Sequence, residues 1–253
     1  MKPKVKKIIG NICYPLAVVL LIFGVWAAAA YAKGVTLILP TPAQAFHELF
    51  AYVQTSVFWC ALANSLWRSF YSFLISFALG LAFALLSRFS EAADRLVRPL
   101  MAIVRAVPTM AIIFILVIWF SRTLAPVVIA VIVICPTLYS AFLSAILSVD
   151  PKLHEMSKVY GVKKRDMLLK LYVPNVAPAL FEGAAGGFSL NIKLIIAAEA
   201  LASTRFSLGG LMQNAKINLE MEKLFAVTVA AIVLSVLCEW IIRLIGRAIV
   251  RWK

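Results

Sequence analysis

The chain has 253 residues, of which 63% are hydrophobic and 14% are charged, and its mean hydropathy is +0.96. A soluble core cannot hide this much apolar surface, so the composition excludes a soluble protein and predicts an integral membrane protein. The net charge of +14 would suit a nucleic-acid-binding protein, but cytoplasmic loops of membrane proteins also accumulate lysine and arginine. The positions of the basic residues favour loops, and we expect no nucleic-acid partner.

The N-terminal segment combines a basic start with a long apolar run. Residues 8–32 carry no charge and are long enough to cross a bilayer. We interpret this run as the first transmembrane helix. The alternative is a signal peptide that is cleaved near residues 30–32, but the apolar run is longer than such peptides usually have.

Residues 33–64 form a mostly exposed connection. Within it, the two prolines of Leu39-Pro40-Thr41-Pro42 favour an extended entry into a short helix over residues 43–52, because proline is tolerated in the first helical turn and the residue before it avoids the helical conformation.

Apolar segments between charged residues predict the remaining architecture. Residues 88–99 are expected to form a cytoplasmic turn, Pro108 is expected to kink the helix that follows, and residues 202–224 are expected to form an outer loop. The fold class is therefore all-α, a single transmembrane domain over residues 1–253 with six transmembrane helices. The five helices after the first are predicted over 69–87, 100–120, 124–147, 177–201 and 225–244.

The basic residues orient these six helices. With both chain ends on one side, 18 of the 25 lysine and arginine residues lie on that side and five lie on the other. The positive-inside rule places the N- and C-termini, together with the loop between the fourth and fifth helices, in the cytoplasm.

That loop, residues 148–175, is the most polar internal stretch. Asp150 suits the N-cap and Pro151 the first turn of a helix that runs to about residue 160, where Gly161 ends it. A second short helix is predicted over residues 163–172, and Pro174 is expected to stop it.

The spacing within this loop carries a family resemblance. Glu155 is followed six residues later by Gly161 and then, thirteen residues later, by Pro174. The segment resembles the cytoplasmic loop of ATP-binding-cassette (ABC) importer permeases, in the branch for nitrate, sulfonates and taurine. The resemblance identifies the ATPase-coupling positions as Glu155, Met156, Ser157, Gly161, Val173 and Pro174, with Met156 and Ser157 in place of the usual two alanines.

In that family the loop is a coupling helix that fits a groove on the ATPase subunit. The alternative from the residues alone is an amphipathic helix that rests on an anionic membrane surface and contacts lipid. Weaker resemblances to the same branch are Leu39-Pro40-Thr41-Pro42, Arg105 to Pro108 without the usual first proline, and Glu199 followed by Ser207-Leu208-Gly209.

The resemblance implies a permease subunit in the bacterial cell membrane that imports a small anionic or heterocyclic solute of the sulfonate, taurine, nitrate or pyrimidine-precursor class. The chain has no Gly-x-x-x-x-Gly-Lys-Ser/Thr phosphate loop, so ATP and Mg²⁺ are expected on a separate ATPase subunit, with no cofactor in this chain. An extracytoplasmic solute-binding protein and a second permease copy, forming a homodimer, are the other implied partners.

Two other classes of protein fit the sequence less well. An ATP-independent secondary transporter or channel would need internal repeats and interrupted helices, and an intramembrane enzyme would need paired catalytic residues. The chain has only two histidines, His47 and His154, and its cysteines are isolated in apolar surroundings. We therefore expect neither catalytic residues nor a metal site. The cysteines are Cys13, Cys60, Cys135 and Cys238.

Charged residues inside predicted helices are costly and indicate function by default. Besides Arg68 and Glu182, they include Lys193 and Glu199. Lys193 is expected to face the translocation path and attract an anionic or polar solute; alternatively, it pairs with Glu182 or Glu199 of another segment. Glu199 is expected close to water at the outer end of the fifth helix, as an interfacial carboxylate or, alternatively, a gate.

A group of small residues lies early in the fifth helix, at Gly183, Gly186 and Gly187. Close helix packing is the favoured explanation, and a substrate site lined by backbone is the alternative.

Overall fold

The computed structural model describes residues 3–249, except for the side chains of residues 3–13, 15, 16, 151, 154, 158, 164, 168 and 169. Every regular element within residues 3–249 is helical, which confirms the all-α class. The elements are α1 (Pro3–Lys33), α2 (Pro42–Val53), α3 (Ser56–Phe89), α4 (Glu91–Ala106), α5 (Thr109–Trp119), α6 (Ala125–Leu147), α7 (Pro151–Val159), α8 (Lys164–Asp166), η1 (Met167–Tyr172), α9 (Val173–Leu201), α10 (Leu208–Ile217) and α11 (Met221–Ile249).

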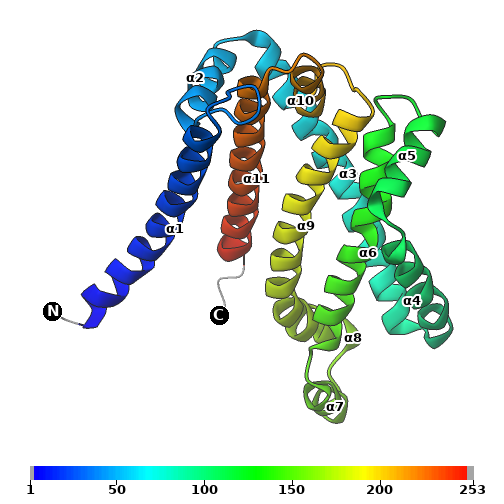
Figure 1. The fold of residues 1–253 in the computed structure, drawn as a ribbon. Helices are drawn as coiled ribbons and strands as arrows, with labels where there is room; N and C mark the ends of the chain where they lie inside the picture. Colours follow the sequence, from blue (N-terminus) through cyan, green and yellow to red (C-terminus); the bar gives the residue numbers. More distant parts are fainter. Residues whose placement is uncertain (1–2, 250–253) are drawn as a thin grey trace.

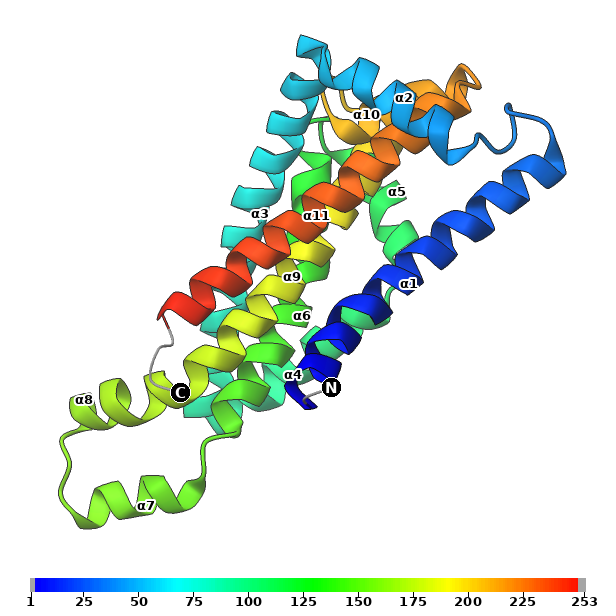
Figure 2. The ribbon, with the colours of Figure 1, turned by 90° about the vertical axis from the view of Figure 1, so that its left-hand side faces the viewer.

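The long helices α3, α6, α9 and α11 form a bundle, with α7 and α8 at one end and α2 and α10 at the other (Figures 1 and 2). We refer to these as the α7 end and the α10 end. Helix α1 begins and α11 ends at the α7 end, while α1 stands apart from the bundle along most of its length (Figure 2). This arrangement is the one expected when both ends of a chain lie on the same side of a membrane.

Four helical segments are long and apolar enough to cross a membrane, and α4 with α5 is a fifth candidate if the bent pair counts as one span. Helix α6 lies within one residue of the predicted limits 124–147. Helix α3 begins well before residue 69, while α1 covers the predicted first span. The count of six membrane crossings stays a prediction.

The prediction that residues 100–120 form one kinked helix is wrong, because two separate helices, α4 and α5, cover this range. Helices α4 and α5 meet at an angle of 90°, with Pro108 between them. Val107 takes an extended conformation (φ −69°, ψ 128°) because the ring of a following proline disfavours the helical region. Residues 91–99 are also helical rather than a turn, since Ser90 caps α4 by accepting a hydrogen bond from the Ala93 backbone N–H at 3.3 Å.

At the α10 end, α2 begins within one residue of its predicted start, whereas the predicted outer loop 202–224 contains the helix α10. Thr41 and Gln44 form a capping box at the start of α2, and the Trp26 indole N–H donates to the Pro40 carbonyl at 2.9 Å. This bond attaches the proline-containing segment that precedes α2 to helix α1. Helix α2 lies across the end of the bundle (Figure 2).

The bundle core depends on close approaches at glycine. A Cβ at Gly187 would lie 2.6 Å from Leu138 Cδ2, and one at Gly183 would lie 3.2 Å from the Cβ of Ala141, so both positions pack α9 against α6 as predicted. Gly186 differs, because nothing lies within 4 Å of its Cβ position. Gly80 of α3 approaches α6 in the same way, 3.1 Å from both Leu138 Cβ and the Tyr139 backbone nitrogen.

Replacing Gly80 by leucine should separate α3 from α6, because the added side chain has no free volume. We expect the Gly80→Leu variant to lose about 1–3 kcal/mol of stability, the usual cost of overpacking, measured by thermal unfolding in detergent. Gly24→Leu is the matched control, since nothing lies within 4 Å of that position. Equal unfolding temperatures of the two variants would contradict the importance of this contact.

Candidate functional site

Helix α7 starts and stops where the sequence indicates. The Asp150 carboxylate accepts a hydrogen bond from the Lys152 backbone N–H at 2.9 Å, as a residue capping a helix N-terminus does. The helix ends at Val159, and Gly161 has φ +65°, a left-handed conformation in which residues other than glycine are strained. Gly161 therefore makes the corner that the spacing predicts.

The segment after this corner differs from the prediction. Pro174 does not stop a helix: α8 is followed by the π-helix η1, which runs without a break into α9, and Pro174 lies in the first turn of α9. The π-helix changes the hydrogen-bond register just before the proline. The helix can then accommodate a ring that lacks an N–H group and would otherwise clash with the preceding turn.

Helix α7 is attached to this continuous helix through Ser157. The Ser157 hydroxyl donates to Met167 Sδ at 2.9 Å, and the Val162 backbone N–H donates to the Ser157 carbonyl at 3.0 Å. Ser157 is buried, and a groove of about 270 Å³ separates α7 from η1 around it. The contact holds α7 beside the start of the helix that enters the bundle.

Helix α7 and the residue after it expose apolar side chains beside one acidic residue. Glu155 is exposed, and Met156, Val159 and Tyr160 expose 55%, 83% and 77% of their surface. Met156 and Tyr160 border the groove toward η1, whereas Glu155 and Val159 lie on the side of the helix opposite Ser157. The structure therefore brings Glu155, Met156, Ser157 and Gly161 together at one corner. Val173 and Pro174 lie apart from it in sequence and structure, at the start of α9, where Val173 is exposed and Pro174 is partly buried.

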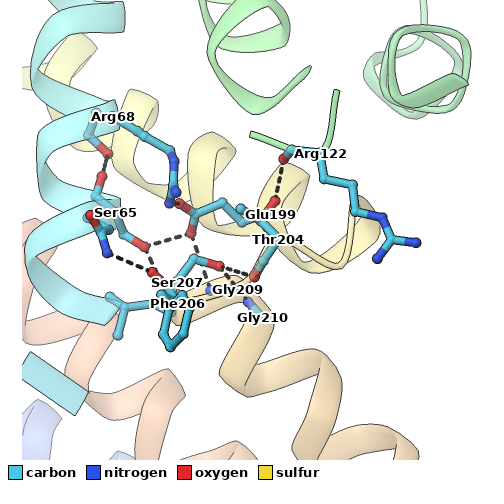
Figure 3. A network of polar contacts seen from close by, with 12 residues as sticks. Ser65, Arg68, Arg122, Glu199, Thr204, Phe206, Ser207, Gly209 and Gly210 are labelled. Atoms are coloured by element: carbon cyan, nitrogen blue, oxygen red, sulfur yellow. Dashed lines mark hydrogen bonds and ion pairs between the residues drawn. The ribbon is translucent and has the colours of Figure 1, made fainter. Parts of the chain in front are cut away.

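The position predicted for Glu199, close to water, is wrong. Glu199 is fully buried, with one carboxylate oxygen 2.9 Å from Arg68 Nη1 and the other accepting from the Ser65 hydroxyl at 2.7 Å (Figure 3). The loop after α9 folds back over the carboxylate, and the Gly209 backbone N–H donates to it at 3.3 Å. With no exposed surface in this conformation, Glu199 does not line a solvent path.

This network connects three helices at the α10 end. The Leu208 backbone N–H donates to the Ser65 hydroxyl at 2.9 Å, so the start of α10 is tied to α3 as well as to α9 (Figure 3). A Cβ at Gly209 would overlap the Ile196 carbonyl oxygen. Glu199 and residues 207–209, which carry one of the weaker family resemblances, thus pack directly against each other in the structure.

Lys193 does not make either of its predicted ion pairs. Glu182 pairs with Arg243, and Glu199 pairs with Arg68. Lys193 is exposed, makes no hydrogen bond or ion pair with the described residues, and acts on Glu239 only through its charge. It lies on an exposed stripe of α9, spaced by three and four residues: Ala179, Glu182, Gly186, Leu190, Lys193 and Ala197.

Arg243 and Glu239 of α11 were not predicted as site residues. Arg243 Nη2 lies 3.0 Å from Glu239 Oε1. Arg243 therefore pairs with two carboxylates, Glu182 on α9 and Glu239 on α11. The i,i+4 spacing of Glu239 and Arg243 was a visible signal. Among the described residues, no group of histidine, cysteine and acidic side chains could hold a metal ion.

The buried ion pair should be important for stability. Removing one partner of such a pair leaves an unpaired buried charge, which costs about 3–5 kcal/mol. We therefore expect Glu199→Met to be strongly destabilised in thermal unfolding, and the double variant Arg68→Met/Glu199→Met to lose less stability than the sum of the losses in Arg68→Met and Glu199→Met alone. An additive double-mutant cycle would contradict direct coupling of the two residues.

Comparisons with known proteins agree with this architecture. Residues 75–251 match the family described as the inner membrane component of binding-protein-dependent transport systems. The chain is similar to the taurine transport system permease protein of Escherichia coli, with 25% identity over 244 residues that cover 94% of this chain and 87% of the relative. It is similar to a Bacillus subtilis permease named for aliphatic sulfonates transport, with 25% identity over 208 residues, 81% of this chain and 71% of the relative.

A solved structure has the same fold over nearly the whole chain. A bacterial ABC transporter that imports the acidic polysaccharide alginate has a chain with a TM-score of 0.66 and 15% identity, covering 97% of this chain and 99% of that one. The family match spans more than half of the chain. The chain therefore belongs to the family of inner-membrane components of binding-protein-dependent transport systems, the permease subunits of ABC importers.

Proposed function

We propose that this permease imports a small anionic or heterocyclic solute and that α7 is the helix that couples it to its ATPase subunit. The observation that carries the proposal is that α7, at the extreme α7 end of the molecule (Figure 1), exposes Glu155 and Val159 on its outer side and Met156 and Tyr160 at the edge of the groove toward η1. An apolar helix surface outside the bundle indicates a partner, and a helix seated in a groove is a recurrent mode of recognition.

The connection from α7 to the bundle supports a mechanical role. Ser157 attaches α7 to η1, and η1 continues into α9 without a break, so a displacement of α7 would move α9 as well. The excess of lysine and arginine at the α7 end supports a cytoplasmic position for that end, where ATP is available. We propose that Val173 and Pro174 belong to the continuous helix formed by η1 and α9, which would transmit the displacement, rather than to the surface that docks on the ATPase.

The exposed stripe of α9 is the best candidate for the translocation path. A charged side chain such as Lys193 is costly against lipid and is expected to face water or protein. We propose that Lys193 faces a path formed with a second copy of the chain and attracts the acidic group of the solute. Sulfonates and taurine, for which the relatives are named, carry such a group.

The membership in the family argues against an ATP-independent transporter or channel. A membrane-surface role for α7 is less well supported, since in both views α7 lies beyond α8 and away from the long helices (Figures 1 and 2).

Changes at the corner of α7 should uncouple ATP hydrolysis from transport. We expect Glu155→Ala and Gly161→Val to reduce solute-stimulated ATP hydrolysis by about tenfold in lipid, because one alters the docking surface and the other strains a φ of +65°. Gly161→Asn is the matched control, since asparagine tolerates this conformation. The measurement uses the permease co-purified with its ATPase and solute-binding protein.

The amount of ATPase that co-purifies with each variant distinguishes lost docking from lost transmission. Variants that retain normal coupled hydrolysis, with the helices folded, would reject the role of α7 and favour the membrane-surface alternative.

Lys193→Met should raise the KM for uptake of an anionic solute by about threefold to tenfold, because it removes one attracting charge from a partly hydrated path. Uptake of radiolabelled taurine into proteoliposomes is the measurement, and Leu190→Met on the same exposed stripe is the control. Unchanged uptake and unchanged selectivity in Lys193→Met would show that Lys193 does not face the path.

A further inference from the structure

A second basic site lies away from α7 and Lys193. A groove of about 560 Å³ separates α4 from the last turns of α6. Its α4 wall is formed by Arg98, Ala102 and Arg105, which share one face at spacings of four and three residues, and Ala102 leaves space between the two arginines. Its α6 wall is formed by Tyr139, Ser140, Leu143, Ser144, Leu147 and Ser148.

The donors in this groove are incompletely used. Arg105 is exposed and makes no hydrogen bond or ion pair with any residue that the structure describes, and the same holds for the hydroxyl of Ser144. Arg98 donates to the Asp94 carboxylate through Nε at 3.2 Å and Nη2 at 3.1 Å, which leaves its Nη1 available. The whole guanidinium of Arg105, Nη1 of Arg98 and one hydroxyl are therefore the donors at the groove for a further ligand.

The other two serines have intrahelical partners. Ser140 Oγ donates to the Pro136 carbonyl at 3.0 Å, and Ser148 Oγ donates to the Ala145 carbonyl at 2.8 Å. These bonds fix the two hydroxyls against α6. They leave Ser144, between the two, as the hydroxyl that can turn toward a ligand.

The surface of α4 indicates from which side a ligand arrives. Its exposed apolar residues are Leu96, Leu100 and Ile103, which at about 100° per residue lie on the side of the helix opposite Arg98 and Arg105. The apolar side suits lipid chains or protein, which leaves the groove on the polar side of α4, the side suited to water. This position favours a soluble ligand over a lipid headgroup.

We propose that the groove between α4 and α6 binds a tetrahedral oxyanion, such as a sulfonate, sulfate or phosphate group, through Arg105, Arg98 and Ser144. Guanidinium groups match such oxyanions through paired N–H donors, and a hydroxyl adds a third hydrogen bond. If the proposed function holds, the natural ligand is the acidic group of the solute near the cytoplasmic side. This last identification rests on the proposed function, whereas the binding site itself does not.

Charged thiol reagents test the site directly. Ser144→Cys, in a chain whose native cysteines are replaced, is labelled in phosphatidylcholine nanodiscs with a sulfonate-bearing and with a trimethylammonium-bearing methanethiosulfonate. We expect the sulfonate reagent to be favoured several-fold, and the ratio of the two rates to fall by about threefold to tenfold on Arg105→Gln, since one charge acts on both reagents. Arg95→Gln is the matched control, because Arg95 pairs with Glu91 and does not line the groove.

Protection by added oxyanions identifies the ligand. Sodium sulfate or methanesulfonate, compared with sodium chloride at equal ionic strength, should slow labelling of Ser144→Cys and should lose this effect in Arg105→Gln. Protection by phosphatidylglycerol in the nanodisc, without protection by sulfate, would keep the oxyanion site but assign it to a lipid headgroup. The absence of both protection and reagent preference would overturn the proposal.

This labelling uses the full chain without ATPase. Its failure would therefore leave the coupling role of α7 intact, and a failure of the coupling experiment would leave the groove intact.

Discussion

The structure depends on satisfying every polar group inside an apolar bundle, where water is not available to do so. Among the described residues, no buried side-chain nitrogen or oxygen lacks a hydrogen-bond partner. The main contributors are Glu199 with Arg68 and Ser65, and Asn191, which donates to the Ser69 carbonyl at 2.7 Å. These contacts join α3 to α9 along one seam. A second contact, between the Ser189 and Ser235 hydroxyls at 2.9 Å, joins α9 to α11.

The two ends of the molecule differ in how firmly the chain is held. At the α10 end the chain is fixed, because backbone N–H groups of residues 208 and 209 bind side chains of α3 and α9. At the α7 end the contacts of α7 are few, and its apolar surface is exposed. A fixed α10 end and an exposed helix at the α7 end are the arrangement that the proposed coupling role of α7 requires.

Much of this was predictable from periodicity, spacing and caps. The apolar runs gave the helices that cross the bundle, and Asp150 with Gly161 gave α7 and its corner, because these signals act over a few residues. The 90° bend between α4 and α5 was not predictable in size, since Pro108 breaks a helix but does not set the angle. The burial of Glu199 was also missed, because it depends on Arg68, 131 residues away in sequence, and on the fold-back of the loop that brings the Gly209 backbone N–H onto the carboxylate. The spacing of Ser65, Ser69, Ser72 and Ser76 on α3 was the available sign of a polar seam.

The π-helix η1 has a consequence for how α7 is aimed. A π-turn is in effect an extra residue held within a helix, and an α-helix turns by about 100° and rises by about 1.5 Å for each residue. Loss of a single residue between Met167 and Tyr172 would restore the regular pitch and swing α7 by about a quarter of a turn around the axis of α9. The direction in which α7 points is thus fixed by the number of residues in this segment, and a deletion there would re-aim the helix without altering any side chain on its outer surface.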